Sequence, residues 1–170
     1  MKTIIVYESK TGFTERYARW AAEELGCESI SLKDASKDRL AGYDRVIFGG
    51  WIMANMISGL PKLREMGVSP AVVFAVGASP AFEEVVAQMR EQNQLQETPL
   101  FYFEGGIDFD RLGFMQRTML KMMKKMTEKK KDMTRQEAAI VQLLAGSFDH
   151  TDRGQLEEML TRLKESDRPC

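Results

Sequence analysis

The chain has 170 residues, of which 44% are hydrophobic and 29% charged, and its formal net charge is −1. This length fits one domain, the composition excludes a disordered chain, and the overall charge selects no class of partner. A signal peptide needs an apolar stretch of about 7–15 residues, whereas the first apolar run, Ile4–Val6, soon reaches the charged Glu8. No apolar stretch approaches the roughly 20 residues of a membrane span. Cys27 and Cys170 lack metal-ligand spacing, so we expect free thiols in a cytoplasmic protein.

Short apolar runs alternate with helical patterns along most of the chain. We expect a first helix from Phe13 to Leu25, stopped by Gly26, a short helix at 61–66, a third opened by Pro80 and ending near Gln92, and a last one around 156–163. The expected strands are residues 3–7, 29–32, 44–50, 72–76 and 100–103. Such alternation predicts an α/β fold: a doubly wound, five-stranded parallel sheet in the order 2-1-3-4-5, with helices on both faces. Residues 1–170 are expected to form a single domain.

The first expected strand and the first helix are joined by Ser9-Lys10-Thr11-Gly12-Phe13-Thr14. A helix N-terminus presents unpaired N–H groups and about half a positive charge, which suits a phosphate. The three hydroxyl side chains add donors, and the glycine lets the backbone curl closely around an anion. The loop has neither the GxxxxGK of nucleoside triphosphatases nor the GxGxxG of dinucleotide-binding folds. It therefore predicts a site for a monophosphate ester held without magnesium, the alternative being a turn that only caps the helix.

This loop resembles the FMN phosphate loop of flavodoxins, which reads [S/T]-x-T-G-x-T, and the element order from Met1 to about Gly106 is also similar. Val46-Ile47-Phe48-Gly49-Gly50 with the residues that follow resembles the second flavin loop of that family, and the residues around Gly77 hold the place of the third. The resemblance implies a flavodoxin-like fold and a redox protein that binds FMN. The residues expected to bind the cofactor are Ser9, Lys10, Thr11, Gly12, Phe13, Thr14, Gly50, Trp51, Ile52, Met53, Gly77, Ala78 and Ser79.

The sequence leaves two candidates for the residue that stacks on the flavin ring. Flavodoxins commonly place an aromatic ring in the second loop, where this sequence aligns Met53 and has Trp51 two residues earlier. Trp51 could instead pack under a helix. No catalytic residue or metal ligand is assigned, since His150 is the only histidine and no nucleophile–base set can be built. The chemistry would belong to the cofactor.

Charge is divided sharply along the chain. Residues 111–135 hold nine basic and two acidic residues, a net charge of +7, which leaves −8 for the rest. Leu112, Met115, Met119, Met122, Met123 and Met126 recur at spacings of three and four, and Lys121, Lys124 and Lys125 lie off that stripe. A basic, methionine-rich amphipathic helix is typical of an anionic membrane surface or an adaptable partner groove. We therefore expect peripheral contact at the inner face of the membrane through Leu112–Met126, or else a helix whose methionines pack on the sheet. Nucleic-acid binding is not expected, because interleaved aromatic residues are lacking.

Residues 107–150, which we call the insertion, also resemble an insertion in the quinone-linked protoporphyrinogen oxidases of bacterial haem synthesis. Arg117–Met126 is similar to its basic, methionine-bearing helix, and Asp132-Met133-Thr134-Arg135-Gln136-Glu137 matches its D-x-T-R-x-E run. Thr151-Asp152 resembles a further short motif of that family. Within the run, Thr134 and Glu137 have the spacing of a capping box and predict a short helix.

Together the two resemblances imply an FMN-dependent oxidoreductase related to protoporphyrinogen oxidase, with a redox protein or a quinone as its electron partner. Two alternatives stay open: a plain flavodoxin-type electron carrier, and a flavodoxin-fold binding module that has lost FMN.

Overall fold

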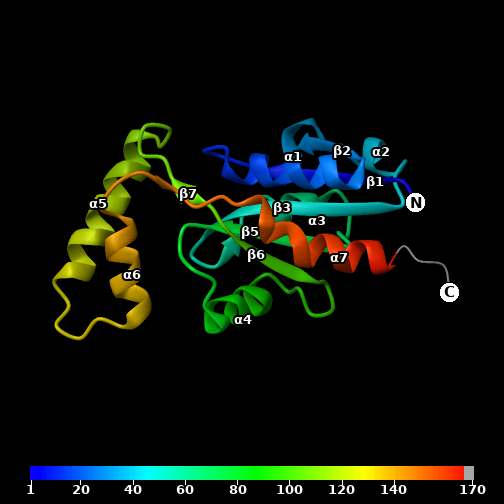
Figure 1. The fold of residues 1–170 in the computed structure, drawn as a ribbon. Coiled ribbons are helices and arrows are strands. Elements are labelled where there is room, and N and C mark those ends of the chain that lie inside the picture. The colour runs from blue at the N-terminus through cyan, green and yellow to red at the C-terminus, as the bar shows by residue number, and fades with distance from the viewer. Residues whose placement is uncertain (167–170) are drawn as a thin grey trace.

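A parallel sheet occupies the centre of the computed structural model (Figure 1), which describes residues 1–166 except for the side chains of Arg135, Gln136 and Ile140. Its strands are β1 (Thr3–Glu8), β2 (Glu28–Ser31), β3 (Arg45–Met53), β5 (Val72–Gly77) and β6 (Leu100–Glu104). Their order, β2-β1-β3-β5-β6, confirms the predicted order 2-1-3-4-5. Cys27 is a free thiol, whereas Cys170 lies outside the described residues.

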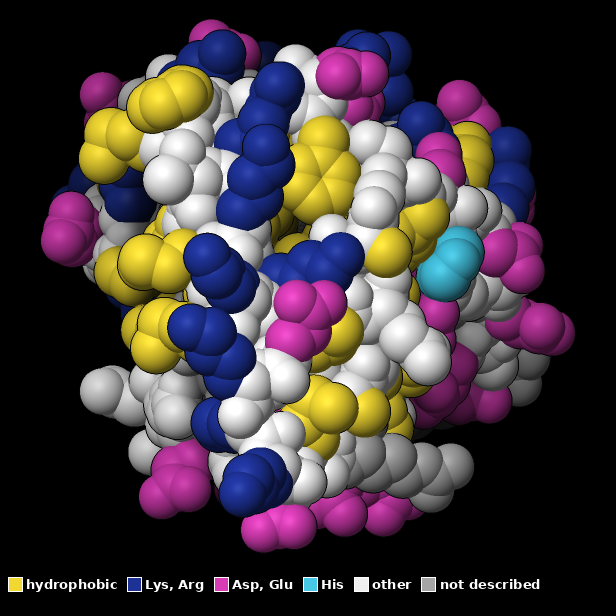
Figure 2. Space-filling model, turned by 90° about the vertical axis from the view of Figure 1, so that its left-hand side faces the viewer, with side chains coloured by type: hydrophobic (Ala, Val, Ile, Leu, Met, Phe, Trp, Pro, Cys, Tyr) yellow, Lys and Arg dark blue, Asp and Glu magenta, His cyan; other side chains and the backbone are white. Residues whose placement is uncertain are grey.

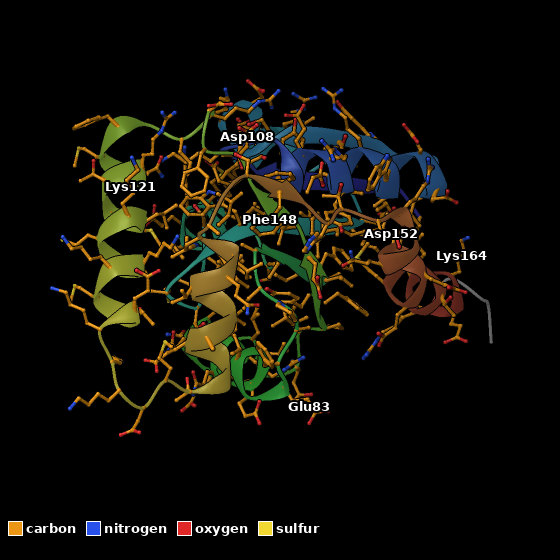
Figure 3. The ribbon with its side chains drawn as sticks, turned by 60° about the vertical axis from the view of Figure 1, so that its left-hand side comes forward. Glu83, Asp108, Lys121, Phe148, Asp152 and Lys164 are labelled. Atoms are coloured by element: carbon orange, nitrogen blue, oxygen red, sulfur yellow. The ribbon has the colours of Figure 1, made fainter. Side chains whose placement is uncertain are left out.

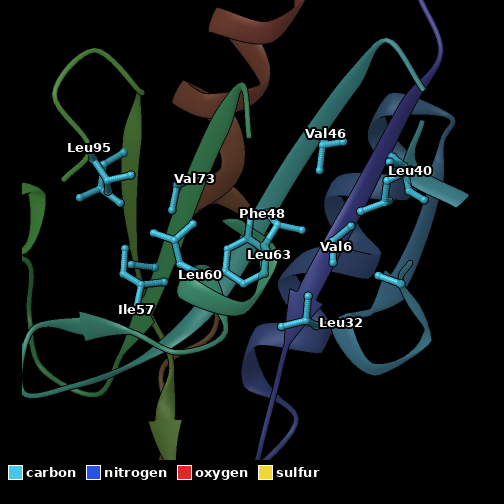
Figure 4. Packing of buried hydrophobic residues seen from close by; sticks show 14 of the residues in the cluster. Val6, Leu32, Leu40, Val46, Phe48, Ile57, Leu60, Leu63, Val73 and Leu95 are labelled. Atoms are coloured by element: carbon cyan, nitrogen blue, oxygen red, sulfur yellow. The ribbon is translucent and has the colours of Figure 1, made fainter. Parts of the chain in front are cut away.

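Two hydrophobic clusters pack helices against the two faces of this sheet. Ile5 and Phe74 pack with α1 (Phe13–Leu25) and α7 (Glu157–Ser166) on one face. On the other face, Val6 and Phe48 pack with α2 (Lys37–Leu40), α3 (Leu60–Glu65) and α4 (Glu83–Gln92), as Figure 4 shows in part. Because successive side chains of a strand point to opposite faces, the continuous apolar runs supply both clusters.

The ends of α1 are as the sequence predicts. The helix begins at Phe13 after Gly12, whose φ of 99° suits glycine, and ends before Gly26, whose φ of 61° forms a left-handed cap. At α4, by contrast, the prediction that Pro80 opens the helix is wrong. Phe82 is the N-cap, and its N–H donates to the Pro80 carbonyl in a tight turn before the helix.

The third strand runs further than the sequence predicts, to Met53, and turns back into β4 (Met56–Ile57), which pairs with it antiparallel. The two turn residues, Ala54 and Asn55, have φ values of 49° and 62°. Positive φ at both central residues is typical of the type I′ turns that close two-residue hairpins. The second strand ends earlier than expected, because Leu32 begins a 3-10 helix, η1 (Leu32–Asp34).

The insertion forms a separate helical layer at one end of the sheet (Figure 1). It begins within β7 (Gly106–Ile107), continues through α5 (Phe114–Glu128) and α6 (Arg135–Leu143), and returns as β8 (Phe148–Asp149), which pairs with β7. The predicted capping box is confirmed: the Glu137 N–H donates to Thr134 Oγ1 (3.2 Å) and the Thr134 N–H donates to Glu137 Oε2 (3.0 Å). No residue of α5 is buried, so the interpretation that its methionines pack on the sheet is wrong.

Within residues 1–166, none of the helices combines the length and the apolar character that crossing a bilayer requires.

The last helix follows η2 (Arg153–Leu156), which Asp152 caps by accepting a hydrogen bond from the Gly154 N–H (2.9 Å). The Asp152 N–H in turn donates to the hydroxyl of Tyr17 (3.2 Å), a fully buried side chain that donates to the Glu104 carbonyl (2.6 Å). The motif Thr151-Asp152 therefore joins α1, β6 and α7.

We expect Tyr17→Phe to change the alkaline stability of the protein. Burial raises the pKa of Tyr17 to about 12, so folding favours the neutral phenol. The stabilisation is complete below pH 10 and is lost as the pH rises through about 12. The variant should be less stable near pH 8 by about 1–2 kcal/mol, for the lost hydrogen bonds, and the difference should shrink toward pH 12. Urea unfolding of both proteins across this range measures it, and a difference independent of pH would contradict the assignment.

Candidate functional site

The carboxyl ends of four parallel strands meet at one edge of the sheet. The register pairs Glu8 of β1 with Gly50 of β3, Trp51 of β3 with Val76 of β5, and Gly77 of β5 with Glu104 of β6. The loops that follow β1, β3 and β5 therefore start at nearly the same level. In doubly wound sheets, ligands bind at this edge, where the strand order reverses.

A cavity of about 190 Å³ lies among these loops. Nine of the thirteen residues expected to bind the cofactor line it: Lys10, Thr11, Phe13, Thr14, Trp51, Ile52, Met53, Gly77 and Ala78. Trp51 is half-buried, belongs to neither hydrophobic cluster and lines the cavity together with residues of α5. Trp51 and Met53 both face the cavity.

The other four expected residues lie around the cavity without lining it. Ser9 Oγ accepts a hydrogen bond from the Gly12 N–H (3.2 Å), and this contact shapes the loop before α1. Gly50 faces the β4–α3 connection, because a Cβ there would lie 2.5 Å from the Ser58 carbonyl oxygen. Ser79 lines a second cavity, described below.

Positive charge gathers at the loop between β1 and α1. The helix begins without a side-chain cap, so its N-terminal N–H groups are not satisfied by a neighbouring side chain. Lys10 Nζ lies 5.7 Å from the centroid of the Trp51 ring. The guanidinium of Arg111, held by Asp108 (3.5 Å), donates to the Thr11 carbonyl (3.2 Å). The loop therefore has donors and cations suited to an anion.

Residues of the insertion also line the cavity. Sequence reasoning did not assign eight lining residues: Val76, Gly106, Ile107, Asp108, Leu112, Gln116, Met119 and Leu120. Leu112, just before α5, and Met119, within it, belong to the apolar stripe read from the sequence, which indicated an apolar contact without identifying the surface that it covers. Figure 3 shows Asp108 and Phe148 on the two chain segments that join α5 and α6 to the sheet.

A polar cluster ties the returning segment of the insertion to α1. The Arg16 guanidinium donates to Asp149 Oδ2 (2.5 Å) and to Thr151 Oγ1 (2.6 Å). Burial acts to raise the pKa of Asp149, but the hydrogen bonds from Thr151 and Arg16 outweigh it, so the pKa lies below its usual value. The carboxylate therefore stays charged and keeps the insertion attached at neutral pH.

A second cavity, of about 310 Å³, adjoins the first. Both are lined by Met53 from the β3–β4 hairpin and by Met119 and Leu120 from α5, and the second also reaches Ser79 and Tyr102. The Tyr102 hydroxyl donates to the Ser79 carbonyl (2.5 Å). Burial raises the pKa of Tyr102, although the hydrogen bond with Ser79 acts against it. Tyr102 is therefore a neutral phenol at physiological pH.

Similarity to solved structures is weak. Oxidised flavodoxin 2 from Bacillus cereus is 18% identical, with a TM-score of 0.45 over 61% of this chain and 84% of that one. The two-electron reduced flavodoxin of Megasphaera elsdenii is 20% identical, with a TM-score of 0.40 over 59% and 82%. The Trp repressor binding protein of Bacillus subtilis is 19% identical, with a TM-score of 0.44 over 89% and 100%. At these values the likenesses carry no argument about function.

No curated protein matches the sequence significantly. A family model described as "Flavodoxin domain" matches residues 4–134. This match spans well over half of the chain and includes the three loops that meet at the cavity. The chain belongs to the flavodoxin domain family.

Proposed function

We propose that this protein binds FMN at the carboxyl edge of its sheet and transfers electrons through it. The observation that carries the proposal is the loop Ser9–Thr14, which leads into an uncapped helix and opens onto a cavity lined by the two other loops. Membership of the flavodoxin domain family supports the same reading.

The residues at the cavity fit the two halves of FMN. Thr11 and Thr14 line it beside the start of α1, so hydroxyl and backbone donors converge where a phosphate would be held. Most of the remaining lining side chains are apolar or aromatic, as in sites that hold flat ring systems. The one lining carboxylate, Asp108, pairs with Arg111, which offsets its repulsion of an anion.

When bound, FMN supplies the redox chemistry. The chain's own residues then bind and enclose it. The loop Ser9–Thr14 holds the phosphate, Trp51 covers the ring, and Leu112, Met119 and Leu120 exclude water from the side of α5. An apolar enclosure strengthens the electrostatic interactions within the site and limits the access of solvent.

The finer proposal is an oxidoreductase related to the quinone-linked protoporphyrinogen oxidases. It is supported by the resemblance of the insertion to theirs and by the cavity that extends under α5 beyond the phosphate loop. An absorbance spectrum of the purified protein, followed by turnover of protoporphyrinogen with a quinone as acceptor, tests the proposal. Flavin absorbance without turnover would favour a carrier that serves a redox protein, and no flavin uptake would favour a binding module.

FMN should bind far more tightly than riboflavin, because the phosphate carries the contacts to the loop. Thr11→Ala should remove one charge-assisted hydrogen bond, worth about 1.5–3 kcal/mol, and weaken FMN binding roughly 10- to 150-fold. Riboflavin affinity should not change. Fluorescence titration measures both, with Thr161→Ala on the exposed surface of α7 as the control. Equal affinity of the wild-type protein for the two flavins would contradict the assignment of the loop Ser9–Thr14 as the phosphate site.

Trp51→Ala should weaken FMN binding by about 0.5–1.5 kcal/mol beyond the loss of contact area, since aromatic stacking adds that much. It should also shift the reduction potential of the flavin. Met53→Ala tests the other stacking candidate, and Met56→Ala in the adjoining strand is a control, because Met56 lines neither cavity. If Met53→Ala alone shifts the potential, Trp51 is not the stacking residue.

A further inference from the structure

Exposed large hydrophobic side chains are concentrated at one end of the molecule. Among the described residues, all of them except Met1 come from the β3–β4 hairpin, α5 and the loop after α5. Phe114 and Met115 are 84% and 83% exposed, and Met126 is 64% exposed. Single exposed apolar residues are ordinary on a protein surface, but a contiguous patch indicates a surface that binds something.

Only one side of α5 is used to enclose the cavities. Gln116, Met119 and Leu120 line the first cavity, and Met119, Leu120 and Met123 line the second. Met115, Met122 and Met126 are separated by seven and four residues, so they form a second row along the helix, and this row stays exposed. The apolar stripe read from the sequence is thus wider than the interface that the fold provides for it.

The β3–β4 hairpin extends this row beyond α5. Met53 lines both cavities together with Met119, which places the hairpin against the helix. Met53 and Met56 are directly paired across the hairpin, so their side chains lie on the same face. Both are exposed. Two elements distant in sequence therefore contribute to one apolar surface.

Basic side chains run beside this apolar surface. Lys121 and Lys125 are exposed on α5, and Lys124 has Glu128 as an ion-pair partner at 4.0 Å. Figure 2 shows Lys and Arg side chains in a column along this end of the molecule, with hydrophobic side chains on both sides of it. Residues 111–135, which include α5, carry a net charge of +7, whereas the remainder of the chain carries −8.

We propose that this end of the molecule docks on an anionic phospholipid surface, with the exposed side chains of α5 and the β3–β4 hairpin entering the headgroup region. The lysines suit the anionic headgroups of such a surface, and the row of apolar side chains suits the boundary between the headgroups and the acyl chains. A second copy of the same face would bring like charges together, and the acidic remainder of the protein would be repelled by the lipid. Docking thus orients the molecule with the cavities toward the membrane. The proposal does not depend on whether FMN is the ligand.

Co-sedimentation with vesicles tests the proposal. The wild-type protein should bind vesicles that contain phosphatidylglycerol at low salt, should bind weakly to pure phosphatidylcholine, and should be released as salt screens the lysines. Each lysine near an anionic surface contributes about 1 kcal/mol. The double variant Lys121→Gln/Lys125→Gln should therefore lower the partition coefficient roughly 30-fold.

Two further variants distinguish binding through this surface from nonspecific electrostatic attraction between the protein and the vesicles. Lys37→Gln/Lys164→Gln removes the same charge from exposed positions in α2 and α7, away from α5 (Figures 1 and 3), and should leave binding unchanged. Phe114→Ser/Met115→Ser removes two exposed apolar side chains and should lower binding without lowering the melting temperature. Flavin affinity, measured on the same variants, should stay at the wild-type value.

Four outcomes would overturn the proposal. The first is no binding of the wild-type protein to phosphatidylglycerol vesicles at low salt. The second is an equal loss of binding when Lys37 and Lys164 are replaced. The third is retention on polyglutamate beads but not on vesicles, which would instead indicate an acidic protein partner. Pelleting in the absence of vesicles would likewise overturn it, in favour of self-association.

Discussion

The parallel register of β1, β3 and β5 is the constraint on which the site depends. Because these strands are hydrogen-bonded in register, the chain leaves the sheet after each of them at the same edge. The register is held by close packing as well as by hydrogen bonds. At Gly49, a Cβ would lie 2.0 Å from Phe74 Cζ, so the aromatic ring of β5 occupies the space that any larger residue of β3 would need. A shift of one strand would separate the phosphate-type loop from Trp51 and Gly77, and the cavity would not form.

The insertion is attached to this edge at three points. The strands β7 and β8 pair where Gly106 leaves no room for a side chain, since a Cβ would lie 2.1 Å from the Phe148 carbonyl oxygen. Arg16 binds Asp149 and Thr151 on the returning segment, and Arg111 binds the backbone of the loop at Thr11. These contacts hold α5 over the cavity, although the helix buries none of its own residues. The cavity is consequently formed by two parts of the chain, the sheet edge and the insertion.

One row of side chains on α5 lines the cavities, and the neighbouring, outer row of methionines is exposed. A helix packed on a sheet buries its apolar stripe against the protein. In α5, only the row of side chains that lines the cavities contacts the rest of the protein. The outer row remains in water, where it contributes nothing to the stability of the isolated chain. A surface that covers the outer row would also approach the cavities, because Met53 and Met119 line them and are at the same time exposed beside that row. A surface bound at this end of the molecule would therefore also limit access to the cavities.

The sequence by itself determined the features that depend on local periodicity and local hydrogen bonds. These include the strand order, the bounds of α1 between Gly12 and Gly26, the position of the loop Ser9–Thr14, and the capping box of Thr134 and Glu137. Only the tertiary structure decided where the amphipathic helix lies, since a stripe of methionines has the same period whether it meets a sheet, a cavity or water. It also decided that Gln116 and Leu120 line the site and that β3 continues into a hairpin at Met53. These features arise from contacts between residues far apart in the chain, which no local pattern encodes.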